Sequence, residues 1–397
     1  MIETAVGLAL FVWGYAVAST SLYGAGRAVW QRMRSAPPRL PEPTRALVVR
    51  PCAGLEPGLD RALASLIHAR TGAEIACRLA VESASDPAAP AATAAVAALR
   101  EAGIDAAVVF TSASAPNHKA AQIAAVVARE ERPFDAIVVA DSDVDLEGFD
   151  LDALLAPLLA GRGERSPADP LAGAVWAPPV EAGAISANGD RASRALLSGS
   201  LHAFTILGSL DGDGLVGKLF AVRRDAIEAA GGFDALERVL GEDMEIARRL
   251  KDAGSSILVA PAVARSLKTG RTWQSAVDRY ARWLTVIRAQ RPHLLASYPL
   301  LFFATPLLLA GSALLAPFAP LLALATALCA LSSRLVTAVC ARALAGFDLS
   351  IREAIADAAL SDALLAHAFA RAMVTRTVTW RGRTLTVDRR GILVEAA

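Results

Sequence analysis

Two long apolar runs lie near the two ends of this sequence, and a stretch of alternating strand and helix patterns separates them. The first run, Thr4–Gly26, contains 23 residues without a formal charge, which is long enough to cross the hydrocarbon core of a bilayer. Three basic residues follow the run at once: Arg27, Arg32 and Arg34. Because basic flanks stay on the cytoplasmic side, we expect residues 1–34 to form an N-terminal transmembrane anchor with its N-terminus outside. A cleaved signal peptide is the alternative, but no basic segment precedes the run.

The second run, Leu294–Ser333, is 40 residues long, about twice the length of one span. Pro317 and Pro320 interrupt it near its middle, and proline breaks a helix, so the run predicts a transmembrane hairpin over residues 294–345. Arg288 and Arg291 precede the run and Arg334 and Arg342 follow it, which places both of its ends in the cytoplasm. We therefore expect a multi-pass protein of the inner (cell) membrane with three spans. A buried helical pair in a soluble protein is the alternative.

Residues 346–397 have a mixed pattern. The segment Ile351–Met373 combines Ala and Leu with charged residues, and this is typical of an amphipathic helix that lies in the membrane interface. From Thr375 to Val387, apolar and polar residues alternate around an Arg-Gly pair, which predicts a β-hairpin. The C-terminal segment is therefore expected to be an interfacial helix followed by a β-hairpin tail.

Between residues 45 and 290, short apolar runs alternate with helical patterns, and Gly161–Asp169 is expected to be a polar loop. The runs predict four strands: Ala46–Val49, Ile75–Val81, Ala106–Phe110 and Ala136–Ala140. Continuous apolar strands between helices indicate a mostly parallel sheet that is covered on both faces. The fold class is therefore α/β, with a cytoplasmic domain over 45–290. Its ligand-binding residues are expected directly after the carboxyl ends of the strands.

Composition and charge narrow the functional classes. The chain has 397 residues, of which 54% are hydrophobic and 20% are charged, and its mean hydropathy is +0.41. The apolar excess fits a protein that faces lipid. The net charge of +1 excludes a polybasic protein that binds nucleic acid. The four cysteines form no Cys-x-x-Cys pair, which fits a reducing compartment and predicts neither a zinc site nor a disulfide scaffold.

Asp141 and Asp143 follow the fourth predicted strand directly. Two carboxylates this close repel each other, and a divalent cation offsets that repulsion. Hard oxygen ligands suit Mg²⁺ or Mn²⁺, and such an ion would bridge the diphosphate of a substrate. Asp145 adds a third carboxylate nearby. A solvated acidic turn or a helix cap is the alternative interpretation.

Two further motifs lie closer to the second apolar run. Glu242 and Asp243 open an amphipathic helix, where a carboxylate is held by free backbone N–H groups and could serve as a general base. Arg279 and Arg282 share one face of a helix just before the run, and Trp283 follows them. Two guanidiniums there could hold a leaving diphosphate. The alternatives are an ordinary helix cap for the first motif and a basic cluster that only fixes membrane topology for the second.

In their order, these motifs resemble the signature of glycosyltransferase family 2 folds: Asp-x-Asp after a strand, Glu-Asp at a helix start, and Arg-x-x-Arg-Trp before a membrane hairpin. Further stretches resemble the ceramide glucosyltransferase-like branch: Arg50–Pro57, Asp86-Pro87, Asn117–Lys119, Gly214–Arg223 and Gly231–Phe233. Within that branch, the sequence looks like the bacterial hopanoid-biosynthesis glycosyltransferases, since they too have an N-terminal anchor, a C-terminal hairpin and a closing Trp-Arg-Gly-Arg like residues 380–383. The resemblance covers about residues 5–390.

The resemblance implies a GT-A-like fold and an inverting transfer of glucose or N-acetylglucosamine from a UDP-sugar to a lipid hydroxyl of a hopanoid or a ceramide-like acceptor. By position, the resemblance implies that Asp243 is the general base and that Asp143 and Asp141 bind the metal ion, Mg²⁺ or Mn²⁺. The implied residues for the nucleotide sugar are Lys119, Glu82, Asp86 and Asp141. Those for the diphosphate and acceptor region are Arg279, Arg282, Trp283 and Glu242.

One position departs from the family pattern. Members usually carry an aspartate after the second strand, where it contacts the nucleobase, and this chain has Ser83 there. Glu82 or Asp86 could substitute for it. Ser83 is the only support for one alternative, a catalytically silent membrane scaffold with the same fold, and the retained Asp141, Asp143 and Asp243 count against it. The other alternative is transfer of sugar to polyprenyl phosphate, by enzymes that rarely need the Arg-x-x-Arg-Trp helix. A membrane transporter is a third alternative. The three expected spans contain no charged residue of the kind that forms an ion or substrate pathway, which argues against it.

Overall fold

The computed structural model describes residues 2–34, 39–112, 115–159, 171–375, 377–380, 383–388 and 391–395. The chain divides into two compact units. We call them the helical unit (Met1–Arg34, Ile185–Leu210 and Arg271–Thr375) and the sheet unit (Ser35–Ala184, Asp211–Gly270 and Arg376–Ala397). The polar loop predicted over Gly161–Asp169 lies outside the described residues. The domain boundaries expected from the sequence stay a prediction.

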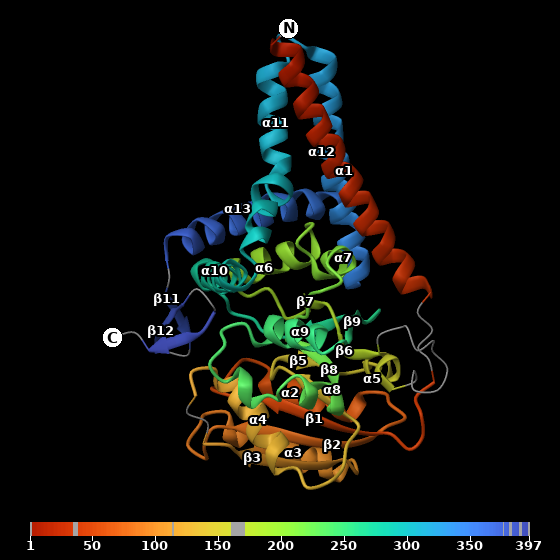
Figure 1. Cartoon of the computed structure of the whole chain (residues 1–397), viewed down its shortest axis with the longest axis vertical. Coiled ribbons are helices and arrows are strands. Elements are labelled where there is room, and N and C mark those ends of the chain that lie inside the picture. Colours follow the sequence, from red (N-terminus) through yellow and green to blue (C-terminus); the bar gives the residue numbers. More distant parts are fainter. Residues whose placement is uncertain are drawn as a thin grey trace. The chain divides into compact units, whose positions relative to one another are not determined.

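A seven-stranded sheet in the order β3-β2-β1-β4-β8-β6-β9 forms the centre of the sheet unit (Figure 1). Its strands are β1 (Arg45–Pro51), β2 (Glu74–Val81), β3 (Asp105–Phe110), β4 (Ala136–Ala140), β6 (Ala172–Trp176), β8 (Leu219–Arg223) and β9 (Ser256–Val259). The first four strands pair in parallel, and β8 runs antiparallel to both β4 and β6. The predicted α/β class and mostly parallel sheet are therefore confirmed.

Helices cover both faces of this sheet. They are α2 (Leu59–Ala64), α3 (Ala89–Glu101), α4 (His118–Arg129), α5 (Asp152–Leu159), α8 (Arg224–Ala229) and α9 (Glu242–Asp252), with short 3₁₀ turns at Ser65–His68 and Asp234–Leu236. Ala46 and Val48 of β1 pack into one core with α2, α3 and α5. Leu47 and Val49 point to the opposite face and are also fully buried. Burial on both faces explains why the strands are continuously apolar in the sequence.

Two small sheets complete the sheet unit. The strands β5 (Val144–Asp145), β10 (Ala264–Ser266) and β7 (Pro179–Glu181) form one of them. The strands β11 (Thr377–Trp380), β12 (Arg383–Val387) and β13 (Leu393–Glu395) form the other. The β-hairpin predicted near the C-terminus is therefore present as β11 and β12, and β13 adds a third strand that the sequence pattern did not predict. The residues between β11 and β12 lie outside the described part of the chain.

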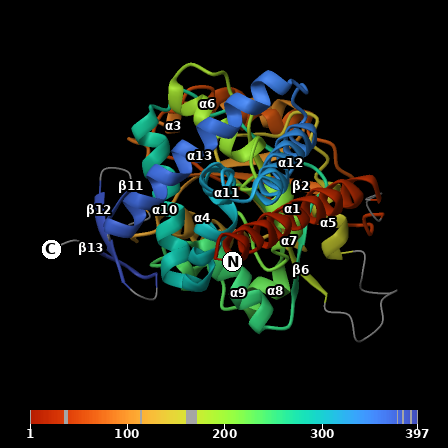
Figure 2. The same ribbon diagram turned by 90° about the horizontal axis from the view of Figure 1, so that it is seen from above.

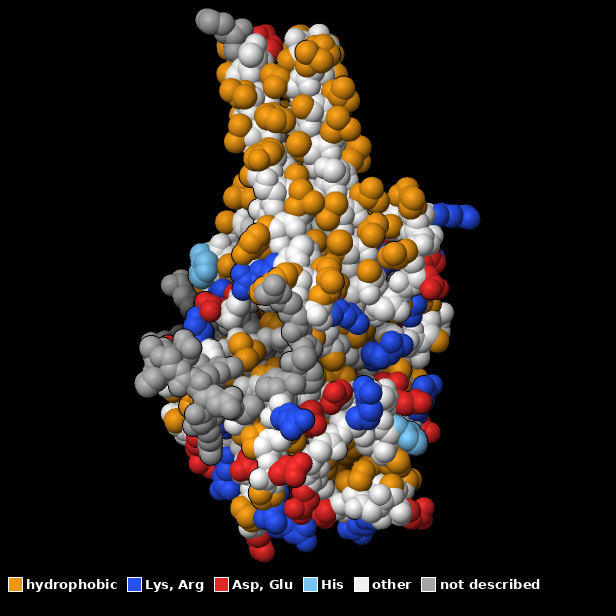
Figure 3. Space-filling model, turned by 90° about the vertical axis from the view of Figure 1, so that its right-hand side faces the viewer, with side chains coloured by type: hydrophobic (Ala, Val, Ile, Leu, Met, Phe, Trp, Pro, Cys, Tyr) orange, Lys and Arg blue, Asp and Glu red, His pale blue; other side chains and the backbone are white. Residues whose placement is uncertain are grey.

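The helical unit contains the apolar segments. Its helices are α1 (Ile2–Arg34), α6 (Asn188–Ser198), α7 (Phe204–Leu210), α10 (Trp273–Gln290), α11 (Ala304–Leu315), α12 (Pro320–Ala345) and α13 (Ile351–Val374), with 3₁₀ and π turns at Pro292–Ala296 and Tyr298–Phe302. Both α1 and α11 pack against α12 (Figure 2). Figure 3 shows that hydrophobic side chains gather on the surface of these helices, as lipid contact requires.

Among the residues that the structure describes, two helices are long and apolar enough to cross a membrane, Ile2–Met33 and Pro320–Ala345. The predicted break at Pro317 and Pro320 is present, because α12 starts at Pro320. The first arm of the expected hairpin differs from a simple span: it is bent by 46° between Pro292–Phe302 and Ala304–Leu315. Two spans are therefore supported by length and composition, and the third stays a prediction.

Two arginines expected to flank the second run lie inside α12 instead. Arg334 pairs with Asp362 of α13 at 2.7 Å, and Arg342 pairs with Asp357 of α13 at 2.5 Å. The sequence pattern could not show this, because the acidic partners follow about one helix later in the chain. Asp357 and Asp362, two of the charged residues behind the prediction of an interfacial α13, thus form ion pairs with α12. The placement of α13 in the membrane interface stays a prediction.

Candidate active site

Acidic side chains from two segments of the sheet unit gather around two lysines. Asp141 and Asp143 follow β4, and Glu242 and Asp243 form the first turn of α9. The lysines are Lys119, in the first turn of α4, and Lys218, directly before β8. Since β4 and β8 are neighbours in the sheet, the backbone N–H of Asp141 donates to the carbonyl of Lys218 at 2.9 Å. The site is built at the carboxyl end of β4, where ligands of such sheets bind.

Lys119 connects the two acidic motifs. Its Nζ lies 2.8 Å from Asp141 Oδ1 and 3.2 Å from Glu242 Oε1, and it donates to the carbonyl of Gly217 at 2.6 Å. Burial opposes the charge of this ammonium, but the carboxylates of Asp141 and Glu242 outweigh that effect and raise the pKa of Lys119 above its ordinary value. Lys119 therefore stays charged and holds the two motifs, which are about a hundred residues apart, in one place.

Lys218 forms ion pairs with both carboxylates of the Asp-x-Asp motif. Its Nζ lies 2.5 Å and 2.7 Å from the two carboxylate oxygens of Asp143 and 3.2 Å from Asp141 Oδ2. The hydroxyl of Ser266 also donates to Asp143 at 2.8 Å. Burial disfavours a charged Asp141, but Lys119 and Lys218 outweigh burial and lower the pKa of Asp141. An internal ammonium therefore stands where the sequence predicts a divalent cation.

Asp243 is held by backbone amides. Its Oδ2 accepts the N–H of Gly217 at 2.9 Å, and its Oδ1 accepts the N–H of Met244 at 2.9 Å. Burial, together with the neighbouring Glu242 carboxylate, raises the pKa of Asp243 to about 6. A carboxylate whose pKa lies this close to neutrality can both take up and release a proton under physiological conditions, as a general base must.

Gly217 allows this close approach of Lys119 and Asp243. A Cβ at position 217 would lie 3.1 Å from Lys119 Nζ and 3.3 Å from both Cβ and Oδ2 of Asp243. Because Gly217 uses its N–H for Asp243 and its carbonyl for Lys119, its backbone is part of the site. A larger residue there would push the two functional groups apart.

Arg50 holds the backbone of the Asp-x-Asp segment through hydrogen bonds to its carbonyl groups. It is fully buried at the end of β1, and its Nη2 donates to the carbonyls of Asp141 at 3.1 Å and Val144 at 2.6 Å. Its Nη1 donates to the carbonyl of Ala62 at 2.5 Å. A guanidinium that satisfies several backbone carbonyls at once sets the direction in which the carboxylates of Asp141 and Asp143 leave the chain.

The residues expected near the nucleobase lie after β2. Asp86 Oδ1 accepts the N–H groups of Gly54 and Ala88, each at 2.8 Å, so this carboxylate links the loops that follow β1 and β2. Glu82 is half exposed and lies 3.6 Å from His118. Ser83, at the position of the usual aspartate, shares a hydrogen bond with Ser85 at 2.9 Å. Glu82 is thus the more available of the two carboxylates, and its role toward a nucleobase stays a prediction.

Asp145 has partners other than the two lysines. Its carboxylate accepts the N–H of Glu147 at 3.0 Å and is 3.9 Å from Arg61. Across the described part of the chain, no group of three or more His, Cys, Asp or Glu side chains is arranged to hold a metal ion. The third carboxylate expected from the sequence is therefore not part of a protein-only metal site.

Arg279, Arg282 and Trp283 lie on α10 in the helical unit. The guanidinium of Arg279 lies 5.0 Å from the ring centre of Trp283 and 5.6 Å from that of Tyr280. Trp283 also contacts Phe204, with 5.5 Å between the ring centres. These contacts give Arg279 a cation–π environment that limits its rotamers. The assignment of the three residues to the diphosphate and acceptor region stays a prediction.

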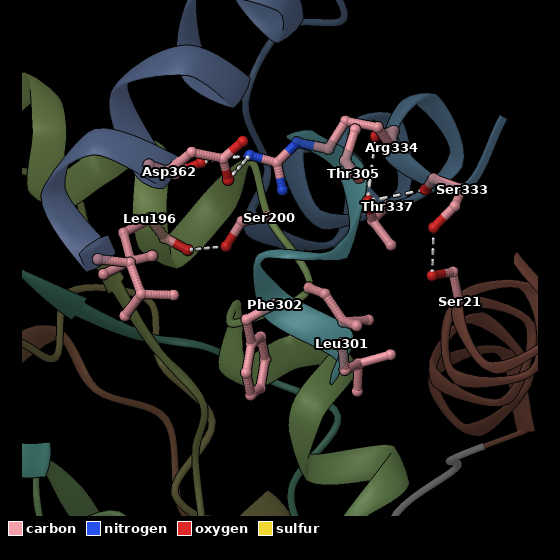
Figure 4. A pocket seen from close by; sticks show the side chains of 13 residues that line it. Ser21, Leu196, Ser200, Leu301, Phe302, Thr305, Ser333, Arg334, Thr337 and Asp362 are labelled. Carbon is pink, nitrogen blue, oxygen red and sulfur yellow. Dashed lines mark hydrogen bonds and ion pairs between the residues drawn. The ribbon is translucent and has the colours of Figure 1, made fainter. Parts of the chain in front are cut away.

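The helical unit also contains a small polar cavity of about 10 Å³, shown in Figure 4. Hydroxyl groups of Ser21, Ser333 and Thr337 line it, together with the ion pair between Arg334 and Asp362. This volume is enough for about one water molecule. The cavity is therefore too small to hold a sugar or a lipid headgroup, and we do not assign it to the site.

Sequence reasoning missed the roles of Lys218, Gly217 and Arg50. All three lie in stretches that resemble the ceramide glucosyltransferase-like branch, but their chemical type did not suggest a function. A glycine next to a lysine directly before a strand is a weak local signal. Only the pairing of β8 with β4 places Gly217 and Lys218 against Asp141 and Asp143.

Comparison with solved structures gives distant likenesses. A mannosyltransferase from Pyrobaculum calidifontis, determined with GDP-Man and Mn²⁺, is 16% identical; the match covers 94% of this chain and 99% of that chain, with a TM-score of 0.47. Glucosyl-3-phosphoglycerate synthase from Mycobacterium tuberculosis, determined with Mg²⁺ and UDP, is 16% identical; the match covers 62% of this chain and 79% of that chain, with a TM-score of 0.36.

No curated protein sequence gives a significant match. The family model of glycosyl transferase family 21 matches residues 11–393, which span both units of the structure. This match agrees with the ceramide glucosyltransferase-like motifs at the level of the family, and it does not test the narrower resemblance to the hopanoid enzymes. The chain belongs to glycosyl transferase family 21, the ceramide glucosyltransferase family.

Proposed function

We propose that this chain is an inverting glycosyltransferase that moves glucose or N-acetylglucosamine from a UDP-sugar to the hydroxyl of a membrane lipid. The acceptor class we propose is a hopanoid or a ceramide-like lipid, and the site faces the cytoplasm. Family membership supports glycosyl transfer, and the apolar helices α1 and α12 support a membrane acceptor. The cytoplasmic orientation rests on the basic flank of α1.

The observation that carries the proposal is Asp243. Inversion needs one base that removes the proton from the acceptor hydroxyl while its oxygen attacks the sugar from the side opposite the leaving diphosphate. Asp243 is partly buried, its orientation is fixed by two backbone N–H groups, and its pKa is raised to about 6. The neighbouring Glu242 is bound to Lys119 and Asn117, which leaves Asp243 as the better base of the two.

The donor set suits a divalent cation once a diphosphate is present. Asp141 and Asp143 offer hard carboxylate oxygens, and Ser266 adds a hydroxyl next to Asp143. Mg²⁺ commonly uses one or two carboxylates and completes its shell with substrate phosphates and water. When bound, such an ion would stabilise negative charge on the departing diphosphate. Lys218 must then leave the two oxygens of Asp143 that it contacts at 2.5 Å and 2.7 Å.

The lysines give the chain its own means of neutralising charge. Once freed from Asp143, the ammonium of Lys218 is available to a phosphate oxygen of the donor. Lys119 remains paired with Asp141 and Glu242. It thereby holds the Asp-x-Asp motif, which would bind the donor, close to Asp243. The chain thus orients the donor with lysines and carboxylates and takes the acceptor proton with a single carboxylate.

The test is transfer by the purified full chain in lipid nanodiscs. UDP-glucose and UDP-N-acetylglucosamine are offered as donors with Mn²⁺, and GDP-mannose serves as the control donor. Ceramide, a hopanoid polyol, diacylglycerol and polyprenyl phosphate are offered separately as acceptors. We expect a lipid product heavier by one hexose or one N-acetylhexosamine in mass spectrometry, and a β-linkage by NMR from the α-linked donor.

Product on polyprenyl phosphate alone would replace the proposed acceptor class. A scaffold without activity would give no product with any acceptor and no donor binding with or without Mn²⁺. Mass spectrometry of membrane lipids from cells with and without the gene extends the test to the natural acceptor, since the missing glycolipid identifies it.

A further inference from the structure

The C-terminal tail contacts the loop that leads into the candidate base. The N–H of Leu240 donates to the carbonyl of Gly391 at 2.9 Å, and the N–H of Leu393 donates to the carbonyl of Arg238 at 2.8 Å. Val239 and Ile392 form an antiparallel bridge between these bonds. Residues 391–393, which lead into β13, therefore pair like a short strand with residues 238–240, just before Glu242 and Asp243.

The other side of the same loop is held by Asn117. This buried side chain donates from Nδ2 to the carbonyl of Val239 at 2.7 Å and to Glu242 Oε2 at 3.2 Å. Its backbone N–H donates to the carbonyl of Glu237 at 2.8 Å. Asn117 also caps α4, whose first turn carries Lys119. The loop thus lies between the helix that carries the site lysine and the C-terminal tail.

The start of α9 depends on this loop. Gly241 precedes the helix and has no side chain that could cap it, so the direction of the first turn is set by the backbone that enters it. Asp243 lies in that first turn, and its Oδ2 must reach the N–H of Gly217. A shift of the loop would therefore move the base relative to Gly217, which comes from a different segment.

Hydrogen bonds between Asp388 and Ile392 stabilise the conformation in which the tail pairs with the loop. Asp388 Oδ1 accepts the N–H of Ile392 at 2.8 Å, and the N–H of Asp388 donates to the carbonyl of Ile392 at 3.1 Å. Gly391 has a φ of 79°, a conformation that glycine adopts without strain. Leu393 is fully buried, which anchors the end of this turn.

The contact is made through backbone hydrogen bonds, and the side chain of Leu393 next to it is buried. Beside it lies a groove of about 620 Å³, lined by Asp234, Glu237, Arg248 and Ile392 among others. The last strand of the central sheet ends at Val259, and the described core cluster on one face of the sheet contains no residue after Ala264. Loss of the tail is therefore expected to leave the sheet folded.

We propose that the described tail residues, Asp388 and Gly391–Glu395, are a positioning element for Asp243: residues 391–393 pair with residues 238–240 and fix the first turn of α9 at the site. This inference rests on the proposed role of Asp243 as the base. It extends the proposed function, because the catalytic geometry then requires a segment more than a hundred residues further along the chain than the base itself.

The experiment compares four full-length variants with a chain that ends at Val387. Asp388→Ala removes the acceptor for the Ile392 N–H, and Asp388→Asn keeps an oxygen at that place. Asp213→Ala is the matched control, since Asp213 is an exposed aspartate of the same unit whose partner is Lys251. Arg238→Ala tests the loop side chain, because the hydrogen bond from Leu393 is accepted by the backbone carbonyl of Arg238, which the substitution retains.

We expect the shortened chain to lose about a hundredfold in kcat and Asp388→Ala about tenfold, since misplacement of a catalytic group by about 1 Å costs that much. Asp388→Asn, Asp213→Ala and Arg238→Ala should stay within about twofold of the unchanged chain. Donor affinity should stay within about twofold in every variant, because the tail does not contact Asp141, Asp143 or Lys119 in the described structure.

Hydrogen exchange separates this inference from the proposed function. The amides of residues 238–244 should exchange at least about tenfold faster in the shortened chain, while those of β1 and β4 keep their protection. This readout needs no enzymatic activity. Unchanged exchange in residues 238–244, or unchanged kcat, would overturn the positioning role. A joint fall of kcat, donor affinity and protection in β4 would overturn it as well, because the tail would then be a general part of the fold.

Discussion

Lys218 Nζ lies 2.5 Å and 2.7 Å from the two carboxylate oxygens of Asp143, so an ammonium of the chain itself occupies the second acid of the Asp-x-Asp motif. Both groups are largely buried, with 15% of the Lys218 side chain and 6% of the Asp143 side chain exposed. Lys218 also contacts Asp141, and breaking a buried ion pair costs far more free energy than breaking an exposed one. A divalent cation that binds here must compete with Lys218 for the same oxygens.

Lys218→Met should therefore strengthen the binding of Mn²⁺ in the absence of nucleotide. We expect a gain of about tenfold, which corresponds to about 1.4 kcal/mol, because the competing ammonium is gone and the two carboxylates repel each other until a cation binds. Electron paramagnetic resonance of free Mn²⁺ measures the affinity directly. Lys251→Met is the matched control, since Lys251 forms an exposed pair with Asp213. An unchanged or weaker affinity in Lys218→Met would show that the lysine does not compete with the metal.

Asp243→Asn should abolish transfer and leave donor binding largely intact. Loss of a general base lowers kcat by about a hundredfold to ten-thousandfold, while the UDP-sugar contacts assigned to Asp141 and Lys119 are retained. Initial rates give kcat, and calorimetry gives the dissociation constant of the donor. Asp252→Asn on the same helix is the control, because Asp252 is exposed and pairs only with Arg248 in the described structure. Normal turnover by Asp243→Asn would remove this residue from the mechanism.

The rate should fall as the pH is lowered through about 6. Asp243 acts only when it is deprotonated, and burial together with Glu242 raises its pKa from 3.8 to about 6. Below that pH, kcat should drop about tenfold per pH unit. The measurement is kcat at saturating donor between pH 5 and 9. A fall that begins only near pH 4 would show that the base has the pKa of an ordinary exposed aspartate.

The same shift predicts an opposite effect on stability. A carboxyl group whose pKa is higher in the folded chain than in the unfolded chain binds its proton more tightly when folded, so its ionisation costs stability above pH 6. That cost disappears as the pH falls from about 6 toward 3.8. Asp243→Asn should consequently melt at a higher temperature than the unchanged chain at pH 8, and the difference should shrink at pH 5. Differential scanning fluorimetry at the two pH values tests this.

The fold was predictable from the sequence where each strand is buried on both faces. The runs at Ala46–Val49 and Ala136–Ala140 are apolar throughout, and both are parallel strands of the central sheet. By contrast, the antiparallel β8 could not be placed, because its sequence does not show which strand it pairs with. The third strand β13 was missed because it consists of only three residues and lies after a turn.

The acidic half of the candidate site was predictable for a similar reason. Asp141 and Asp143 follow a strand end, and Asp243 opens a helix, and both are local signals. Lys218 and Arg50 act through long-range contacts to Asp143 and to the carbonyl of Asp141. A lysine or an arginine in isolation is more often a solvated surface residue, so only the three-dimensional arrangement assigns these two a role.

Gly217→Ala offers the sharpest test of the site's close packing. The added Cβ would lie 3.1 Å from Lys119 Nζ and 3.3 Å from Asp243 Oδ2, so the two groups must move apart to admit it. We expect kcat to fall about tenfold to a hundredfold, because a displacement of the base by a fraction of an ångström already misaligns it with the acceptor hydroxyl.

Gly212→Ala provides the matched control for this substitution. Gly212 precedes the same segment, and a Cβ there would meet nothing within 4 Å. Its kcat should equal that of the unchanged chain, and the melting temperatures of both variants should stay within about 2 °C of it, since neither changes the core of the sheet. If Gly217→Ala turned over at the normal rate, Lys119 and Asp243 would tolerate a wider spacing, and the backbone of Gly217 would not be a determinant of catalysis.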